Sequence, residues 1–152
     1  MADVPDEMMA KGRLEDKNFE DSELLYRRIR PDDIEGQKIT IEAIELPDMS
    51  VNREKFGPPE WLLLSDGFEN WGVFKFQVSH IPESLLQNGT IEYRFMPKHR
   101  PLKKNYPHSE VWAFRDGQHI DVKNSDILLD PDAHQRWRQQ LAWKCRLEIV
   151  PE

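Results

Sequence analysis

Two runs in the middle of the chain alternate between apolar and polar residues, and this period most narrows the folds that the chain can adopt. The segments Val73–Val78 and Thr90–Met96 each carry three large apolar side chains at every second position. Successive side chains of a strand point to opposite faces, so this pattern predicts two half-buried strands of a sheet.

Further strands are predicted on both sides of this central pair. Glu23–Ile29 is a short apolar run that is closed by a proline, and Ile39–Leu46 alternates again. Downstream, Glu110–Phe114 and His119–Val122 flank Asp116-Gly117, and Asp-Gly between β-prone runs is a strong hairpin signal. The chain therefore supplies enough strands for one sheet.

The C-terminal part predicts the one long helix. Asp130 is a suitable N-cap and Pro131 suits the first helical position, and apolar residues then recur at intervals of four. After this helix the period returns to two, with one face formed by Trp143, Cys145, Leu147 and Ile149. We expect a final half-buried strand there.

These elements predict an α+β fold. A chain of 152 residues suits one domain and is short for two. We expect a twisted, mainly antiparallel sheet of about six or seven strands, with the C-terminal helix packed across it. Short helical turns are expected after Pro58 and Pro82. The strand order does not follow from the sequence.

Charge is distributed unevenly along the chain. Residues 1–23 hold eight acidic and three basic residues, which leaves a net charge of −2 of the total −7 for the rest. We therefore expect an acidic, solvated N-terminal tail over residues 1–23 and a single globular domain over residues 24–152, because termini are often poorly ordered unless tied down.

A proline-punctuated basic stretch between Arg94 and His108 contains no acidic residue. It is predicted to form a loop that displays charge to an anionic partner. The candidate binding residues in it are Arg94, Lys98, Arg100, Lys103, Lys104 and Tyr106.

Two early arginines are further candidates for binding. Arg27 and Arg53 lie at the edges of early strands, where a guanidinium group can hold phosphate or carboxylate in a bidentate manner. An ion pair with a neighbouring acid is the structural alternative for each of them.

Candidate catalytic residues are sparse. His108 and Glu110 are expected to share one side of a strand and to act as acid and base if the protein is an enzyme, whereas Ser109 faces away. The single cysteine, Cys145, is predicted to be buried and inert. We expect no metal and no cofactor, since a zinc site would need scattered histidines.

Several classes of protein are disfavoured by the sequence. No apolar run approaches the length of about 20 residues that a membrane span needs, and the acidic N-terminus lacks the basic flank of a secretory signal. We therefore expect a cytoplasmic protein with no membrane contact. The negative net charge argues against general nucleic-acid binding but permits a local contact.

Three spaced segments resemble the signatures of a group of small uncharacterised bacterial proteins. These segments are Leu25–Ile29 (Leu-Tyr-Arg-Arg-Ile), Met49–Arg53 (Met-Ser-Val-Asn-Arg) and Asn105–Val111 (Asn-Tyr-Pro-His-Ser-Glu-Val). Members of the group carry a Leu-Tyr-Arg-Arg-Ile/Val strand, then Ser-Val-Asp-Arg, then an Asn-Pro-x-His-Ala-x-Val loop. In this chain Asn52 and Ser109 depart from the pattern, and Tyr106 is inserted before the proline.

The resemblance implies an accessory component of a bacterial conflict or defence operon, with no assigned reaction. It also implies that Arg27, Arg53 and His108 converge on one site.

Three functions from different classes are compatible with the sequence. The favoured function is a non-enzymatic accessory or adaptor protein that binds a larger protein from its own operon. The second is a small enzyme acting on a phosphate-bearing nucleotide or a substrate like nicotinamide dinucleotide. The third is a nucleic-acid-binding module that uses the basic stretch, with Tyr93, Phe95 and Tyr106 as stacking platforms.

Overall fold

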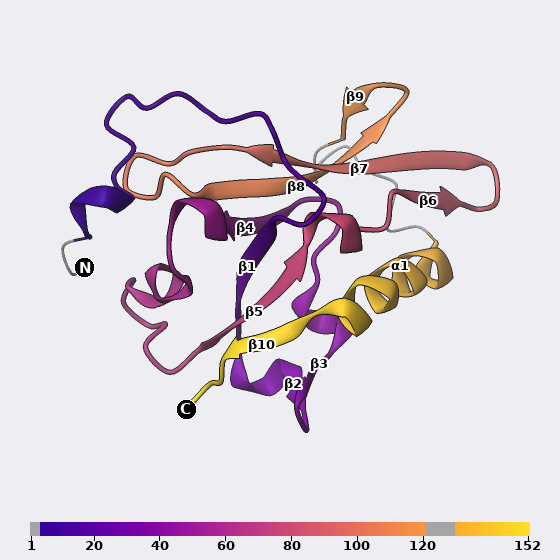
Figure 1. Ribbon diagram of the computed structural model, residues 1–152. Coiled ribbons are helices and arrows are strands. Elements are labelled where there is room, and N and C mark those ends of the chain that lie inside the picture. The colour runs from indigo at the N-terminus through magenta and orange to yellow at the C-terminus, as the bar shows by residue number, and fades with distance from the viewer. Residues whose placement is uncertain (1–3, 121–129) are drawn as a thin grey trace.

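One antiparallel sheet forms the body of the protein (Figure 1). The computed structural model describes residues 4–120 and 130–152, and within them this sheet has eight strands in the order β10-β5-β1-β4-β8-β7-β6, with β9 paired to β8. Every pair is antiparallel. The strands are β1 (Leu24–Ile29), β4 (Met49–Arg53), β5 (Gly72–Gln77), β6 (Ser84–Gln87), β7 (Ile91–His99), β8 (His108–Arg115), β9 (Gln118–His119) and β10 (Arg146–Ile149).

One α-helix and several short elements complete the described part of the chain. The helix is α1 (Pro131–Lys144), and a two-stranded hairpin pairs β2 (Ile34–Glu35) with β3 (Lys38–Ile39). Short 3-10 turns are η1 (Asp6–Met8), η2 (Pro31–Asp33), η3 (Ile41–Ala43), η4 (Glu54–Phe56), η5 (Pro59–Leu63) and η6 (Val78–His80). The predicted α+β class with a single domain is confirmed. Of the helices in the described ranges, none has the length and apolar character needed to cross a bilayer.

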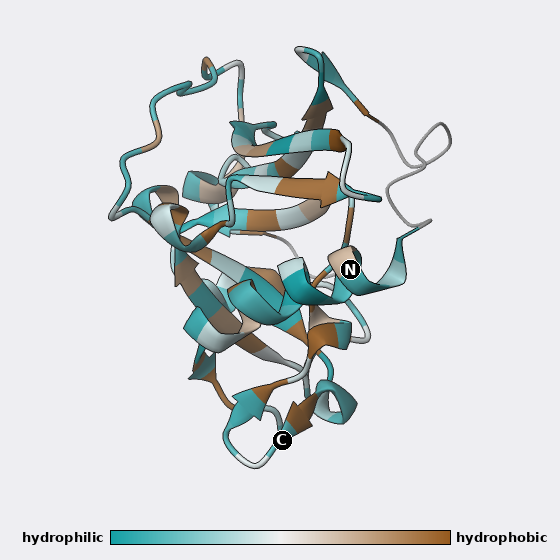
Figure 2. Cartoon of the chain, turned by 90° about the vertical axis from the view of Figure 1, so that its right-hand side faces the viewer, coloured by the Kyte–Doolittle hydropathy of each residue, from teal (hydrophilic) through white to brown (hydrophobic). Residues whose placement is uncertain are grey.

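Helix α1 begins as the sequence predicts and covers the core. The Asp130 side chain accepts a hydrogen bond from the Ala133 N–H at 3.2 Å, and Pro131 occupies the first helical position. Trp137 and Leu141 are buried against the sheet, and the Trp137 indole N–H donates to the Pro82 carbonyl at 3.2 Å. Figure 2 shows the mainly hydrophilic outer side of this helix in front of apolar strand segments.

Two hairpin turns explain one correct and one wrong prediction. Asp116-Gly117 and Asn88-Gly89 both have positive φ at their two residues, as the central residues of a type I′ turn require. The Asp-Gly hairpin is confirmed up to His119, and Val122 lies outside the described residues. The helical turn predicted after Pro82 is wrong, because Asn88-Gly89 joins β6 to β7 and does not end a helix. The turn predicted after Pro58 is confirmed as η5.

The strand predicted over Ile39–Leu46 is also wrong. After β3 the chain enters the turn η3, and the Thr40 N–H bonds the Asp33 carbonyl at 2.8 Å. The Ala43 carbonyl accepts from Arg27 Nε at 3.0 Å, so a side chain takes the place of a neighbouring strand. The true second long strand is β4, which the sequence analysis did not identify.

The start of the last strand differs from its prediction as well. Trp143 belongs to the last turn of α1 and is 66% exposed, and β10 begins only at Arg146. Helix α1 continues to Lys144, beyond the residue at which the alternating pattern starts. Trp143 therefore follows the helical period and does not join the buried face.

Residues 4–23, the N-terminal segment, pack on the body. In Figure 1 this segment, drawn in indigo, passes the connection between β7 and β8 before it enters β1. Met8 is buried, and its carbonyl accepts from the Tyr106 N–H at 2.7 Å, while the Ala10 N–H donates to the Lys103 carbonyl at 2.9 Å. Residues 4–23 therefore do not extend into solvent as the expected acidic tail.

The helix face that contacts the sheet yields the first testable prediction. Leu141→Ala is expected to lower the free energy of unfolding by about 2–5 kcal/mol, because Leu141 is fully buried and its removal leaves a cavity. The matched control is Gln140→Ala, an exposed position of the same helix, where a change below about 0.5 kcal/mol is expected. Urea denaturation followed by circular dichroism measures both, and equal effects would contradict the packing.

Candidate functional site

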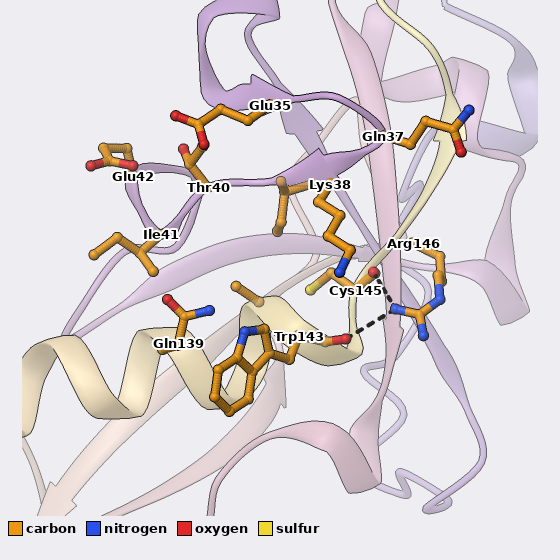
Figure 3. Close-up of a pocket in the computed structure, with 12 residues that line it drawn as sticks. Glu35, Gln37, Lys38, Thr40, Ile41, Glu42, Gln139, Trp143, Cys145 and Arg146 are labelled. Carbon is orange, nitrogen blue, oxygen red and sulfur yellow. Dashed lines mark hydrogen bonds between the residues drawn. The ribbon is translucent and has the colours of Figure 1, made fainter.

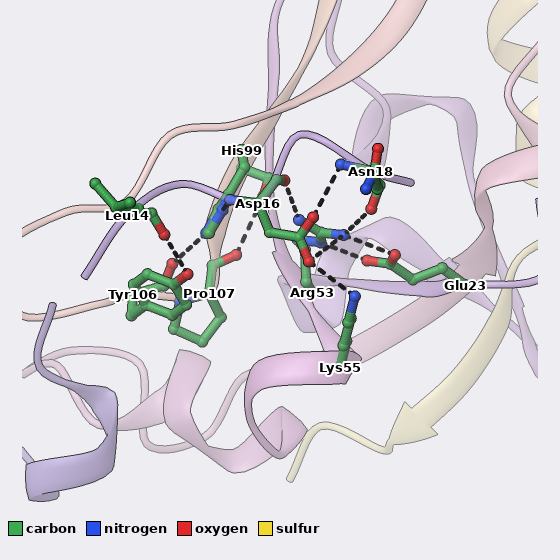
Figure 4. Close-up of polar contacts among 10 residues, drawn as sticks. Leu14, Asp16, Asn18, Glu23, Arg53, Lys55, His99, Tyr106 and Pro107 are labelled. Carbon is green, nitrogen blue, oxygen red and sulfur yellow. Dashed lines mark hydrogen bonds and ion pairs between the residues drawn. The ribbon is translucent and has the colours of Figure 1, made fainter. Parts of the chain in front are cut away.

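Arg53 lies at the end of β4 with none of its side chain exposed, and it organises the N-terminal segment (Figure 4). Its Nε and Nη2 donate to the two carboxylate oxygens of Glu23, at 2.5 and 2.8 Å. Its Nη1 donates to the Asp16 carbonyl and its Nη2 to the Asn18 carbonyl, each at 2.6 Å. The guanidinium also stacks over Phe19 at 3.8 Å.

These contacts assign Arg53 to the interior. A guanidinium has five N–H donors, and the N-terminal segment takes up four of them. A buried charge is stable only when it is paired and hydrogen-bonded. Arg53 therefore fixes the path of residues 16–23, and it has no pair of free N–H groups with which to bind an external anion.

His99 holds the same segment from β7, which is separated from β4 by β8. Its Nδ1 accepts from the Asp16 N–H at 2.8 Å, so the ring proton resides on Nε2, which donates to the Tyr106 carbonyl at 2.7 Å. The ring stacks on Phe56 at 5.4 Å between centroids. Burial lowers the pKa of His99, and the Arg53 charge lowers it further, so the neutral form is favoured.

The aromatic residues predicted as stacking platforms are not available on the surface. Tyr93, Phe95 and Tyr106 are all buried. The Tyr106 hydroxyl donates to the Leu14 carbonyl at 2.6 Å, and the Arg13 guanidinium covers its ring at 3.6 Å. Tyr93 and Phe95 point to the core face of β7, which follows from the alternation itself. The prediction that these three rings form exposed stacking platforms is wrong.

A groove of about 760 Å³ opens where β1 and β4 separate. These two strands pair only through Leu25 with Arg53 and Tyr26 with Asn52, and beyond that point their backbones diverge. The walls come from the loop after η5, the connection between β7 and β8, and the start of the N-terminal segment. We call it the arginine groove, and its polar lining consists of Arg27, Arg28, Glu45, Ser50, Asn52, Ser65, Lys104, Asn105 and His108.

Arg27 fills the gap between the diverging strands. Its Nε donates to the Ala43 carbonyl at 3.0 Å and its Nη1 to the Ser50 carbonyl at 2.9 Å, while Nη2 lies 3.0 Å from a Glu45 carboxylate oxygen. Burial lowers the pKa of Arg27 and Glu45 opposes this shift. An arginine remains protonated at neutral pH despite such a shift, so Arg27 carries a positive charge that Glu45 balances in part.

An aromatic wall faces this charge. The Arg28 guanidinium stacks over Phe68 at 3.8 Å, and Phe68 meets Trp71 edge-on at 4.7 Å between centroids. Trp61 also lines the groove. The combination of cationic and aromatic side chains suits a ligand that has both negative charge and apolar surface.

His108 reaches the groove and Glu110 does not. The His108 Nδ1 lies 2.8 Å from the Arg100 carbonyl, and its Nε2 lies 4.0 Å from a Glu110 oxygen. Glu110 accepts from the Trp112 indole N–H at 2.7 Å. Ser109 is buried and donates to the Pro107 carbonyl, so no hydroxyl nucleophile faces His108 from this strand.

The remaining predicted cations are spread over one strand, β7, and the loop that follows it. Arg94 bonds Glu92 at 2.9 Å, Lys98 lies 5.6 Å from the Phe114 ring centre, and Arg100 lies 5.1 Å from that of Trp112. Residues 100–107, which we call the basic loop, carry Lys103 and Lys104. Both are exposed, and neither forms an ion pair within residues 4–120 and 130–152.

The candidate residues therefore divide into two sets. Arg27, Lys104 and His108 converge on the arginine groove, and Arg53 lies outside it against the N-terminal segment. The sequence analysis did not include Arg28 or the aromatic wall among its candidate site residues, although the Arg27-Arg28 pair and the tryptophans Trp61 and Trp71 were visible as signals. In the described part of the chain, no three histidine, cysteine or acidic side chains are grouped so that they could hold a metal ion.

Comparison of the chain with protein-family models, with curated proteins and with solved structures finds no match.

The Arg53 contacts predict a large loss of stability when one partner is removed. Arg53→Met is expected to lower the free energy of unfolding by about 3–5 kcal/mol, because it leaves the buried Glu23 carboxylate unpaired. The double variant with Glu23→Gln is expected to recover part of this loss. Lys55→Met is the matched control, since its pair with Asp16 is partly exposed and such pairs contribute about 0–1 kcal/mol. Equal losses for Arg53→Met and Lys55→Met in urea titrations would refute this role.

The His99 contacts predict a pH dependence of stability. The pKa of His99 is lower in the folded than in the unfolded chain, so its contribution is complete above about pH 6.5 and is lost as the pH falls toward the folded pKa. His80 and His134 have pKa values lowered by burial and act in the same direction. Urea titrations of the wild type and of His99→Asn across this range isolate the contribution of His99. Identical slopes for the two proteins would rule it out.

Proposed function

We propose that this protein is a non-enzymatic accessory or adaptor protein that binds an acidic, partly apolar segment of a larger protein in the arginine groove. The observation that carries the proposal is the lining of this groove. Arg27, Arg28, Lys104 and His108 face one acidic residue, Glu45, beside a wall that contains Phe68 and two tryptophans.

The chemistry of this lining favours binding over catalysis. Arg27 and Arg28 are held by backbone carbonyls and an aromatic ring, so their positions are fixed before a ligand arrives. Preorganised donors lower the cost of binding. His108 is held through Nδ1, and the nearby Ser109 hydroxyl is turned into the core, which weakens the case for a nucleophilic or acid–base reaction at this histidine.

The basic loop extends the same surface. Lys104 lines the groove and Lys103 is exposed beside it. Exposed charges at the rim of an interface steer association and set its salt dependence. A partner segment with several carboxylates meets these lysines first and the arginines at the floor afterwards.

The resemblance of three segments to small bacterial proteins suggests where the partner comes from. On that ground we place it in the same bacterial operon, within a cytoplasmic defence or conflict system. This part of the proposal rests on the resemblance and not on the geometry of the groove.

The test is copurification of tagged protein from its native host with two charge-reversal variants. The double variant Lys103→Glu and Lys104→Glu is expected to weaken the complex about tenfold or more, because it reverses both exposed charges at the groove. The matched control reverses two exposed cations of α1, Arg136→Glu and Lys144→Glu, and is expected to retain the partner. Mass spectrometry quantifies the partner that is retained by each variant.

Three outcomes would count against the proposal. The first is a partner that both double variants retain equally. The second is the absence of any stoichiometric protein. The third is nucleic acid as the bound component, recognised by its sensitivity to nuclease and by a steep fall of affinity with salt.

A further inference from the structure

A second cleft, distinct from the arginine groove, lies between the β2–β3 hairpin and the end of α1 (Figure 3). It encloses about 690 Å³, and we call it the hairpin cleft. Ile39, Ala142 and Cys145 line it and are buried, so its floor is apolar. Its rim is formed by side chains of the hairpin on one side and of the last helical turn on the other.

Trp143 stands at this rim without a packing role. Its side chain is exposed, although tryptophan normally buries most of its surface. In the described part of the chain, no aromatic ring and no cation stacks on it. The indole therefore offers a free flat face next to the cleft.

The polar side chains around the indole are also available to bind a ligand. Gln37, Lys38 and Gln139 line the cleft, and within residues 4–120 and 130–152 none of them makes a side-chain hydrogen bond or ion pair. Figure 3 shows Gln139 next to Trp143 on the helix and Lys38 reaching toward the helix end. Amide groups both donate and accept hydrogen bonds, so this rim can satisfy hydroxyl groups of either orientation.

The charges of the hairpin cleft balance. Glu35 and Glu42 oppose Lys38 and Arg146. A phosphate or another strong anion therefore gains no net attraction here, in contrast to the arginine groove. The hairpin cleft favours a ligand that is neutral and rich in hydrogen-bonding groups.

We propose that the hairpin cleft binds the ring of a neutral sugar, with Trp143 as its stacking platform. One face of a pyranose ring carries C–H groups that pack on an indole, while its hydroxyls bond to amide and carboxylate groups at the ring edge. Among the described residues that line the cleft, Trp143 is the one aromatic side chain, whereas a nucleobase is usually held between two flat apolar groups. The lining thus matches a sugar better than a base.

The test uses the full-length protein and uncharged methyl glycosides of glucose, galactose, mannose and N-acetylglucosamine. Binding is followed through the indole N–H signals in two-dimensional NMR spectra, with the Trp143 signal assigned from Trp143→Phe. We expect one of these glycosides to shift the Trp143 signal selectively, with a Kd of about 1 mM, a value ordinary for a single ring in an open cleft.

Variants separate this site from nonspecific contact. Trp143→Ala and Gln139→Ala are each expected to weaken binding about tenfold. Gln140→Ala is the matched control, because Gln140 is exposed on the same helix and does not line the cleft. Thermal unfolding of Trp143→Ala confirms that the exposed position tolerates the change.

The proposal is overturned if none of the four glycosides moves the Trp143 signal, or if Trp143→Ala binds as tightly as the wild type. Selective binding of nucleotides or of sulfated sugars in this cleft would also overturn it. None of these results depends on the partner proposed for the arginine groove.

Discussion

The buried guanidinium of Arg53 holds together parts of the chain that are far apart in sequence. It sits at the end of β4 and bonds to the carbonyls of Asp16 and Asn18 and to the carboxylate of Glu23, which immediately precedes β1. Because a buried charge without partners is costly, the N-terminal segment and the centre of the sheet are stable only together. His99 adds a second attachment from β7, so the segment is held by strands on both sides of β8.

At the other end of the β1–β4 pair, a second arginine, Arg27, takes the place of backbone pairing. Beyond Asn52 the strands β1 and β4 diverge. There the Arg27 side chain donates hydrogen bonds to the Ser50 and Ala43 carbonyls, in the place of the backbone N–H groups of a paired strand. The two arginines thus have opposite consequences. At one end of the β1–β4 pair, Arg53 binds the N-terminal segment, which covers that end. At the other end Arg27 fills the gap between the diverging strands, and the arginine groove remains open there.

Local pattern accounts for most of the elements, and long-range polar contacts account for the errors. The period-two runs, the Asp-Gly hairpin and the capped C-terminal helix follow from residues close together in sequence. Strand β4 was missed because its buried positions include Asn52 and Arg53, whose partners lie in distant segments. Of the residues predicted for a site, Arg27, Lys104 and His108 line the arginine groove. The aromatic wall with Phe68 and Trp71 comes from the irregular connection between η5 and β5, which has no sequence period to reveal it.

The charge arrangement also bears on the kind of partner that the arginine groove suits. The exposed acids Asp6 and Glu7 lie on η1, and the segment that carries them bonds to the basic loop. Charges separated by more than about 8–10 Å are largely screened at physiological salt, so Lys103 and Lys104 act only over a short range. A long polyanion that extends past the loop meets the negative charge of the N-terminal segment and of a chain whose net charge is −7. A short acidic segment that ends at the aromatic wall avoids this repulsion, which is the physical reason that we propose a protein partner rather than nucleic acid for the groove.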